Sequence, residues 1–321
     1  MSVQLTRLPA CLTLIFFAIT IQAVPANADI ALPTHPTPDT SINQAINTEI
    51  LSLVSLNLAH GRKDSLNQLL VPDKTIRSNL DDIAALLRKH NPDVVALQEA
   101  DGPSVWSGNF DHVAYLAEAA GYPWYTRSDH VKSKYINFGT GLLSAVPFQD
   151  VISHDFPSTP PTLTKGFTLG QIEWQPDSDR TPITVDILSV HLDFSRKAVR
   201  EQQVSDILNV LQGRKNPVII LGDFNSDWLA KDSVIKRMVA CGKVHTFEPE
   251  SNMLGTYKSG KHRLDWVLLS TELEFRSYRV LPDIVSDHQP VIVEVVYTGK
   301  SQHKTDDTEC QNASSMNAPA S

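Results

Sequence analysis

The segment Pro217-Val-Ile-Ile-Leu-Gly-Asp-Phe-Asn-Ser-Asp227 carries the strongest structural signal in this chain of 321 residues. Its apolar run from Val218 to Leu221 predicts a buried strand that delivers Asp223 and Asn225 to its carboxyl-terminal lip. Because residues two apart in a strand point to the same side, both polar side chains face one space and Phe224 faces away. An ionised carboxylate is costly to bury without a partner, which favours a polar cleft. The same residues could also close the strand as an Asx turn with no further role.

The start of the chain has the features of a secretory signal. Arg7 supplies a positive charge, Leu12 to Ile21 form an apolar core, and Ala26-Asn27-Ala28 matches a cleavage site. The apolar run falls short of the roughly 20 residues of a membrane span, so cleavage is favoured over a single-span anchor. We therefore expect residues 1–28 to be a signal peptide, and the protein to be exported, either periplasmic or secreted, with no transmembrane span in the mature chain.

Charge and cysteine content limit the possible partners. Cleavage would leave 27 basic against 36 acidic residues, a net charge of −9. This acidity argues mildly against a dedicated high-affinity DNA binder, for which a basic surface is expected. The mature chain would keep Cys241 and Cys310, which are too few for a disulfide framework, and whether they pair stays open. We expect no zinc site built from thiolates, and we expect a monomer.

The chain divides into four segments. After the signal peptide, residues 29–49 are rich in Pro and polar residues and predict a flexible leader. Residues 50–298 hold the apolar periodicity and are long enough for one large core. Residues 299–321 are polar and aperiodic, and they predict a disordered tail.

Strands and helices alternate early in the folded segment, and strands dominate later. We expect strands at residues 51–57, 93–99, 122–126, 141–145, 167–174, 183–191, 218–223, 264–270, 275–280 and 291–297. Helices are expected near residues 76–87, 112–120, 204–211 and 234–239. This mixture of hairpin-like segments and helical crossovers predicts an α/β fold with two packed mixed β-sheets flanked by helices.

Several predicted strands end in, or are flanked by, residues that chemistry could use. These are Asn57, Glu99, His191, Asp223, Asn225, Asp265, Asp287 and His288. Strands also end in polar residues simply because they end at the surface, so each residue alone has a structural explanation. Asp265 lies in an apolar strand and needs a partner, for which His288 is the candidate.

Together these residue types indicate phosphoester hydrolysis. The carboxylates of Glu99 and Asp287 and the amide of Asn57 are hard oxygen donors that suit Mg²⁺. His191 and Asn225 could donate hydrogen bonds to phosphoryl oxygens, while Asp223 or an imidazole could take a proton from water. Acyl transfer fits poorly, because the chain has no Gly-x-Ser-x-Gly elbow.

The order of the motifs adds a resemblance to a known family. The motifs are Ser55-Leu56-Asn57, Leu97-Gln98-Glu99, His191-Leu192-Asp193, Gly222-Asp223-Phe224-Asn225, Leu264-Asp265-Trp266 and Ser286-Asp287-His288-x-Pro290. Over about residues 50 to 297 the chain resembles the endonuclease/exonuclease/phosphatase superfamily. The resemblance implies a four-layer α/β sandwich with its site at the top of the two sheets.

The resemblance also implies roles for the motif residues. Mg²⁺, with Mn²⁺ as a substitute, would bind near Glu99 and Asn57, and Asp287 would be a second metal contact or a hydrogen-bond acceptor. His191 and Asn225 would contact phosphate, Asp223 would act as a base or orient water, and Asp265 would support His288. Whether Asp223 or the Asp265–His288 pair takes the proton is left open.

The turn after Asn57 departs from the nuclease branch. Apurinic endonucleases carry a nearby acidic metal contact, whereas this chain reads Leu58-Ala59-His60-Gly61-Arg62. His60 and Arg62 could contact substrate or belong to a solvated loop, and Asn137 is a further candidate for a phosphate contact. We expect a Mg²⁺-dependent phosphodiesterase acting on a phospholipid, sugar phosphate or nucleic acid. The alternatives are an endonuclease acting on DNA or RNA, and an inactive phosphate- or lipid-binding relative.

Overall fold

Two six-stranded sheets form the centre of the molecule. The computed structural model describes residues 44–65, 67–231, 233–299 and 310. The first sheet has the order β11-β12-β1-β2-β4-β3, with β1 Ile50–Asn57, β2 Val94–Asp101, β3 Trp124–Lys132, β4 Asn137–Ser144, β11 Leu273–Val280 and β12 Val291–Tyr297. The second has the order β5-β6-β7-β8-β10-β9, with β5 Val151–Asp155, β6 Gly166–Trp174, β7 Ile183–His191, β8 Val218–Asp223, β9 Val244–Thr246 and β10 Asp265–Ser270.

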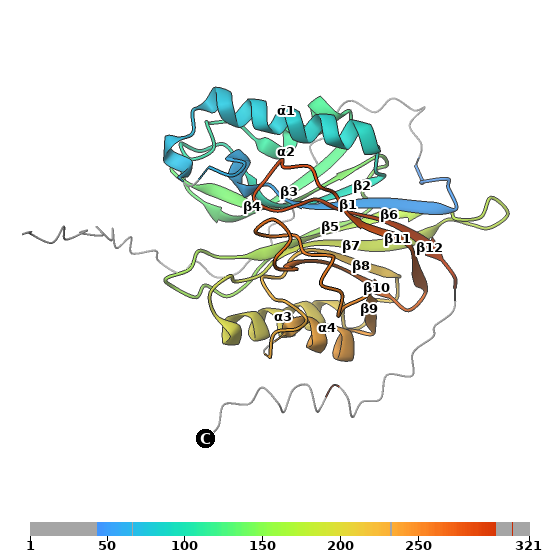
Figure 1. The fold of residues 1–321 in the computed structure, drawn as a ribbon. Helices are drawn as coiled ribbons and strands as arrows, with labels where there is room; N and C mark the ends of the chain where they lie inside the picture. Colours follow the sequence, from blue (N-terminus) through green and yellow to red (C-terminus); the bar gives the residue numbers. More distant parts are fainter. Residues whose placement is uncertain (1–43, 66, 232, 300–309, 311–321) are drawn as a thin grey trace, which may run out of the picture.

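Helices cover the outer face of each sheet (Figure 1). The first sheet is covered by α1 (Asp73–His90) and α2 (His112–Ala120), and the second by α3 (Lys197–Leu211) and α4 (Val234–Gly242). Two short 3₁₀ helices, η1 (Ala59–Gly61) and η2 (Gln68–Leu70), follow β1. One apolar cluster fills the space between the sheets, and a second and third lie under the helices. The expected four-layer α/β sandwich is therefore confirmed.

The central strands are buried on both faces, which explains their nearly continuous apolar sequence. In β1, Leu51 and Leu53 belong to the cluster between the sheets, whereas Val54 and Leu56 belong to the cluster under α1 and α2. The opening segment of the sequence forms β8, and all six residues of this strand are buried. Because side chains alternate in direction along a strand, the side chains of one strand pack into two different apolar clusters.

The connections between strands place all the predicted polar strand ends at one edge of the sandwich. β1 pairs with β2 in parallel, and β7 pairs with β8 in parallel, with α1 and α3 as the crossovers. The antiparallel strands β10 and β12 begin where β8 and β1 end, as the pairs Asp265–Asp223 and Val291–Ser55 show. We call this the carboxyl edge, because β1, β2, β7 and β8 end there.

The sequence predicts that the folded part begins at residue 50, but in the structure it begins a few residues earlier. Ile46 is buried in the core and bridges in parallel to Trp174, although residues 29–49 were expected to be a flexible leader. The Trp174 indole donates a hydrogen bond to the Thr48 carbonyl at 2.7 Å. The few apolar residues of the segment 29–49 lie among Pro and polar residues and form no sustained period, which is why the sequence pattern does not indicate this contact. Two short strands, β5 and β9, were also not expected.

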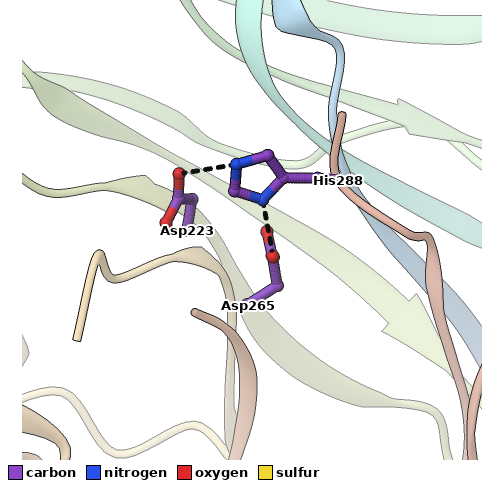
Figure 2. Close-up of side chains that lie close together, drawn as sticks. All are labelled: Asp223, Asp265 and His288. Carbon is purple, nitrogen blue, oxygen red and sulfur yellow. Dashed lines mark hydrogen bonds and ion pairs between the residues drawn. The ribbon is translucent and has the colours of Figure 1, made fainter. Parts of the chain in front are cut away.

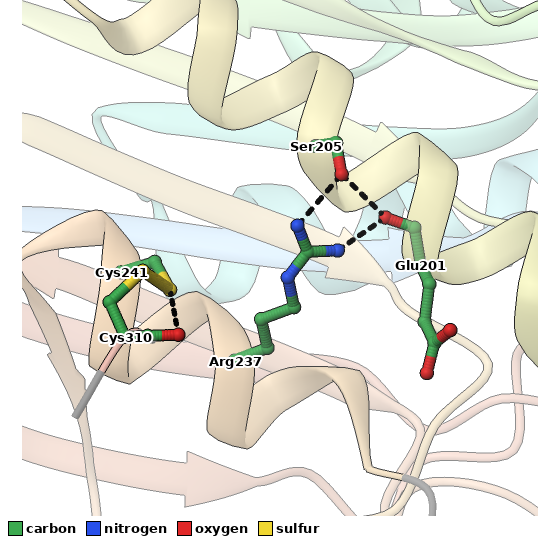
Figure 3. Close-up of a disulfide and its surroundings, with 5 residues drawn as sticks. All are labelled: Glu201, Ser205, Arg237, Cys241 and Cys310. Atoms are coloured by element: carbon green, nitrogen blue, oxygen red, sulfur yellow. Dashed lines mark hydrogen bonds between the residues drawn. A yellow bond between two sulfur atoms is a disulfide. The ribbon is translucent and has the colours of Figure 1, made fainter. Parts of the chain in front are cut away.

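The two cysteines of the expected mature chain form a disulfide (Figure 3). Cys241 lies in the last turn of α4, and Cys310 lies 69 residues further along the chain. One turn before Cys241, the guanidinium of Arg237 donates to the Glu201 carbonyl and to the Ser205 hydroxyl, which joins α4 to α3 (Figure 3). These contacts anchor the end of α4 to α3 and to Cys310.

The expected signal peptide lies outside the described residues, and only Gly299 and Cys310 of the expected tail are described. Among the helices of the described residues, none combines the length and the apolar character that a membrane span requires.

Candidate active site

Asp223 is the centre of a hydrogen-bonded group at the carboxyl edge. It is 2% exposed, and its Oδ2 accepts a hydrogen bond from Nδ2 of Asn57 at 3.0 Å. Its Oδ1 accepts from the backbone N–H of Asn225 at 2.9 Å. The ring nitrogen Nε2 of His191 lies 3.6 Å from Oδ2. Residues from the ends of β1, β7 and β8 therefore meet at one carboxylate, as their order in the sequence predicted.

His288 lies between two carboxylates (Figure 2). Its Nδ1 is 2.7 Å from Oδ2 of Asp265, and its Nε2 is 3.8 Å from Oδ2 of Asp223. The Thr256 hydroxyl also donates to Oδ2 of Asp265, at 2.5 Å. Burial alone would lower the pKa of His288, but the charges of Asp265 and Asp223 raise it to about 10. Asp265 therefore has the partner that its apolar strand required, and this partner is His288.

Burial raises the pKa of Asp223 to about 7, even though the neighbouring His288 favours the carboxylate. A group with a pKa near neutrality can both take and release a proton, which is what a general base requires. Nε2 of His288 faces the same carboxylate from the other side. Because the raised pKa of His288 keeps its ring protonated near neutrality, Asp223 is the group that can accept the proton of an attacking water.

Glu99 lies on the other side of this group, in a strained backbone position. It has a φ of 48°, and the pairing of β2 with β4 shifts register between Gln98 and Ala100. Its Oε2 lies 3.2 Å from Nε2 of His60, whose Nδ1 lies 2.7 Å from Oδ1 of Asp101. Although burial opposes it, the charge of His60 helps to hold the pKa of Glu99 far below its usual range. Glu99 is therefore an ionised carboxylate held in place by a bulge and a histidine.

A buried lysine accompanies His191. Lys165 immediately precedes β6, and Gly166 pairs with His191 across the strands. The Nζ of Lys165 lies 3.3 Å from both ring nitrogens of His191. Burial, together with the charge of Lys165, holds the pKa of His191 well below its ordinary value. His191 is therefore a neutral imidazole, which can donate a hydrogen bond through one nitrogen only.

A cleft of about 460 Å³ opens over these groups. Arg62 reaches into it and donates from Nη2 to Oδ2 of Asp287 at 2.6 Å and from Nη1 to the Ser65 carbonyl at 2.8 Å. Asn225 has a φ of 48° and donates from Nδ2 to the Leu192 carbonyl at 3.0 Å. The lining residues are Arg62, Glu99, His191, Phe194, Asp223, Asn225, Tyr257, His262, Leu264, Asp287 and His288.

The structure places the predicted site residues in three groups. Glu99, His191, Asp223, Asn225, Asp287 and His288 line the cleft, while Asn57 and Asp265 lie behind it and bond to Asp223 and His288. His60 lies behind Glu99 and is not among the lining residues. Asn137, at the start of β4, is buried, has an unpaired Oδ1, and does not line the cleft.

The donor set suits a divalent cation. Asp223, Asp265 and His288 present ligand atoms within 4.8 Å of one another. However, His288 and Thr256 both bond to Oδ2 of Asp265, and the His288 ring lies between the carboxylates, so a cation there would displace it. Glu99 in the cleft and the amide of Asn57 offer hard oxygens without that conflict. We regard the Glu99 side of the cleft as the better cation site.

Four site residues were not predicted as such from the sequence. Lys165 follows a run of Thr and Pro, and Thr256 and Tyr257 lie in an irregular loop, so none of them has a periodic signal. The ring of Tyr257 packs against that of His288 with centroids 4.8 Å apart. Arg62 was only weighed as a possible contact. The one sequence signal that could have indicated Thr256 and Tyr257 is their position in the Gly255-Thr256-Tyr257 turn, shortly before the Leu264-Asp265-Trp266 motif.

Comparison with known proteins agrees with this geometry. The sequence profile of the Endonuclease/Exonuclease/phosphatase family matches residues 54–288 of the chain. The chain belongs to this family. Its members are in general hydrolases of phosphoesters and typically use a divalent metal ion. None of the curated proteins compared with the chain matches it.

Solved structures of the family share the fold. An endonuclease/exonuclease/phosphatase from Beutenbergia cavernae DSM 12333 is 19% identical, with a TM-score of 0.58 over 77% of this chain and 72% of its own. A mannosyl-6-phosphatase from Bacteroides thetaiotaomicron VPI-5482 is 19% identical, with a TM-score of 0.57 over 77% and 100%. The human Nocturnin catalytic domain is 20% identical, with a TM-score of 0.56 over 78% and 96%. At these identities the likeness supports the fold alone.

Proposed function

We propose that this protein is a Mg²⁺-dependent phosphoesterase, and more specifically a phosphodiesterase, that hydrolyses its substrate by in-line attack of water. The observation that carries the proposal is the convergence of Glu99, His191, Asp223, Asn225 and His288 on one cleft. These residues come from β2, from the ends of β7 and β8, from the segment just after β8 and from the loop before β12, and they supply an ionised carboxylate, two hydrogen-bond donors, a candidate base in Asp223 and an imidazolium in His288. Family membership supports the reaction class.

Glu99 and Asn57 would hold the cation. When bound there, Mg²⁺ would polarise the phosphoryl group and neutralise charge that develops on its oxygens. Glu99 is ionised, and within the described residues the Oδ1 atom of Asn57 accepts one hydrogen bond, from the Ala59 N–H, which leaves it a second lone pair. Mn²⁺ would serve as a substitute, because both cations prefer oxygen ligands.

The remaining residues would bind the phosphate and move the proton. His191 donates from one imidazole N–H, and Asn225 has one amide N–H left after its bond to the Leu192 carbonyl. Asp223 lies between these donors and His288, so it can orient a water molecule and take its proton. Asp265 holds His288 by Nδ1, which leaves Nε2 directed toward Asp223.

An exposed aromatic side chain at the cleft favours a substrate with an apolar portion. Phe194 lines the cleft and is 64% exposed. This ring could contact the part of a diester that lies outside the phosphate. A phospholipid is therefore at least as good a candidate as a sugar phosphate, and nucleic acid is less favoured by the net negative charge.

A substrate panel tests the proposal. The purified protein, without residues 1–28, is incubated with a chromogenic aryl diester, the matching monoester, dispersed sphingomyelin, phosphatidylinositol phosphates and supercoiled plasmid, with Mg²⁺ and with EDTA. We expect diester hydrolysis that requires Mg²⁺. Plasmid nicking as the dominant activity would favour the endonuclease. Ligand binding with no turnover of any substrate would favour the inactive relative.

We also propose that the protein is exported as a monomer, with residues 50–298 as its catalytic domain. The Ala26-Asn27-Ala28 site supports cleavage, and the Cys241–Cys310 disulfide is typical of an oxidising compartment such as the periplasm or the cell exterior. Mass spectrometry of the protein recovered from each compartment would give its amino terminus. A chain that keeps residues 1–28 in the cytoplasm would contradict export.

A further inference from the structure

Besides Asp223, two carboxylates line the cleft, and they have different partners. Asp287 receives Nη2 of Arg62 at 2.6 Å, and the two side chains are 25% and 22% exposed. The same guanidinium is fixed by its bond to the Ser65 carbonyl. Because arginine keeps its charge at any pH that the protein survives, Asp287 already has a permanent counter-ion.

The Oε1 atom of Glu99 remains able to coordinate a cation. The Oε2 atom faces His60 at 3.2 Å, whereas Oε1 accepts no hydrogen bond from the described residues and lies 4.0 Å from Nε2 of His191. The amide oxygen of Asn57 also keeps a lone pair. Glu99, which lines the cleft, and Asn57, which lies behind it, therefore each keep an oxygen lone pair that no described residue uses.

The turn after β1 adds no further oxygen ligand to the cleft. It presents Leu58, Ala59 and His60, and His60 turns away to lie between Glu99 and Asp101. The ammonium of Lys165 adds a further buried positive charge beside His191, and no carboxylate in the described part of the chain lies within 4.0 Å of it. Arg62 and Lys165 therefore supply charge that a second metal ion would otherwise bring.

We propose that Arg62 keeps Asp287 out of cation coordination, so that the cleft holds one divalent cation, on its Glu99 side, and not two. A second cation on Asp287 would have to displace the guanidinium or lie against it. This inference rests on the proposed function for its choice of Mg²⁺ and Mn²⁺, but its consequence is a number of bound ions and can be measured without turnover.

The test counts Mn²⁺ ions on metal-stripped protein by isothermal titration calorimetry and by electron paramagnetic resonance of the free ion. We expect one site in the wild-type protein and one site of similar affinity in Asp287→Asn. Glu99→Gln should lose the site. Arg62→Met should bind a second ion, because Asp287 then loses its counter-ion. Lys63→Met is the matched control, since Lys63 pairs with Asp82 outside the cleft, and it should keep one site.

Each opposing outcome overturns the inference. Two ions on the wild-type protein, or loss of the site in Asp287→Asn, would show that Asp287 is a ligand. A single ion on a folded Arg62→Met protein would show that Arg62 does not exclude the second. Far-ultraviolet circular dichroism and thermal melting establish that each variant is folded. An inactive protein with one Mn²⁺ would refute the proposed function and leave this inference standing, whereas an active protein with two would do the reverse.

Discussion

The ammonium group of Lys165 lies 3.3 Å from both ring nitrogens of His191, and the lysine is 7% exposed. A buried ammonium without a carboxylate partner destabilises the fold. We expect Lys165→Met to raise the free energy of unfolding by about 1 to 3 kcal/mol. We also expect the variant to lose about tenfold in kcat, less than the loss of a direct phosphate donor, because positive charge near the phosphate is removed.

Urea unfolding and initial rates on the best diester check both effects of Lys165→Met. The control is Lys134→Met, because Lys134 is exposed on the turn between β3 and β4 and lies over the ring of Tyr135. The Lys134→Met variant should show nearly the free energy of unfolding and the kcat of the wild-type protein. If Lys165→Met unfolds at lower urea and keeps full activity, the lysine has only a structural role.

Asn225→Ala should lower kcat by about 10²- to 10³-fold if the amide contacts the transition state. Because Asn225 has a φ of 48°, alanine there also adds about 1 kcal/mol of backbone strain. Asn109→Ala separates the two effects, since Asn109 has a φ of 60° in an exposed loop outside the cleft. It should show the loss of stability without the loss of rate. Unaltered turnover in Asn225→Ala would remove this residue from the site.

The raised pKa of His288 makes the stability of the metal-free protein depend on pH. The imidazolium is favoured in the folded state, where its pKa is about 10 against 6.5 for a free histidine. Its contribution is therefore complete below about 6.5 and is lost as the pH rises through about 10. The raised pKa of Asp223, about 7, acts in the same direction, because its protonated form is also favoured in the folded state.

Urea midpoints of the EDTA-treated protein between pH 6 and 10, a range chosen from these pKa values, check this dependence. In Asp265→Asn the imidazolium loses its main partner, so stability at the acid end should fall by on the order of 3 kcal/mol and the slope with pH should flatten. Equal slopes in both proteins would mean that Asp265 does not set the charge of His288.

Reduction of the Cys241–Cys310 disulfide should lower stability without lowering activity. The closed segment spans 69 residues, for which the chain-entropy effect has an upper bound of about 4 kcal/mol. Cys241 lies three residues before Val244, which pairs with Ser270 at the edge opposite the site. Thermal melts of Cys241→Ser, Cys310→Ser and the double variant should agree with one another, and their kcat values should equal that of the wild-type protein. A loss of activity in any of them would connect this bond to the cleft.

The sequence could predict those parts of the structure that repeat locally. Strand β8 and the helical face of α1 follow from their periodicity, and the chemistry-bearing ends of β1, β2 and β7 follow from where apolar runs stop. The missed strand β5 is short and only partly buried, so its pattern is weak.

Contacts that depend on register or on distant pairing could not be predicted. Lys165 meets His191 only because β6 and β7 pair with Gly166 opposite His191, and no local pattern fixes that register. Arg62 and Asp287 are 225 residues apart and are joined by a turn and a loop without periodicity. His60 was expected either to contact substrate or to belong to a solvated loop. The structure places it behind Glu99, in a left-handed backbone conformation with a φ of 55°.

The bridge between Ile46 and Trp174 limits where a shortened recombinant protein can begin. The segment before β1 crosses from one sheet to the other at the end of the sandwich far from the cleft. Its contacts with Trp174 therefore join the two sheets at that end. A recombinant version started at Ile50 would leave the Trp174 indole without its acceptor and a hole where Ile46 packs. A recombinant protein that begins at Gln44 or earlier keeps both the Ile46–Trp174 bridge and the hydrogen bond from the Trp174 indole.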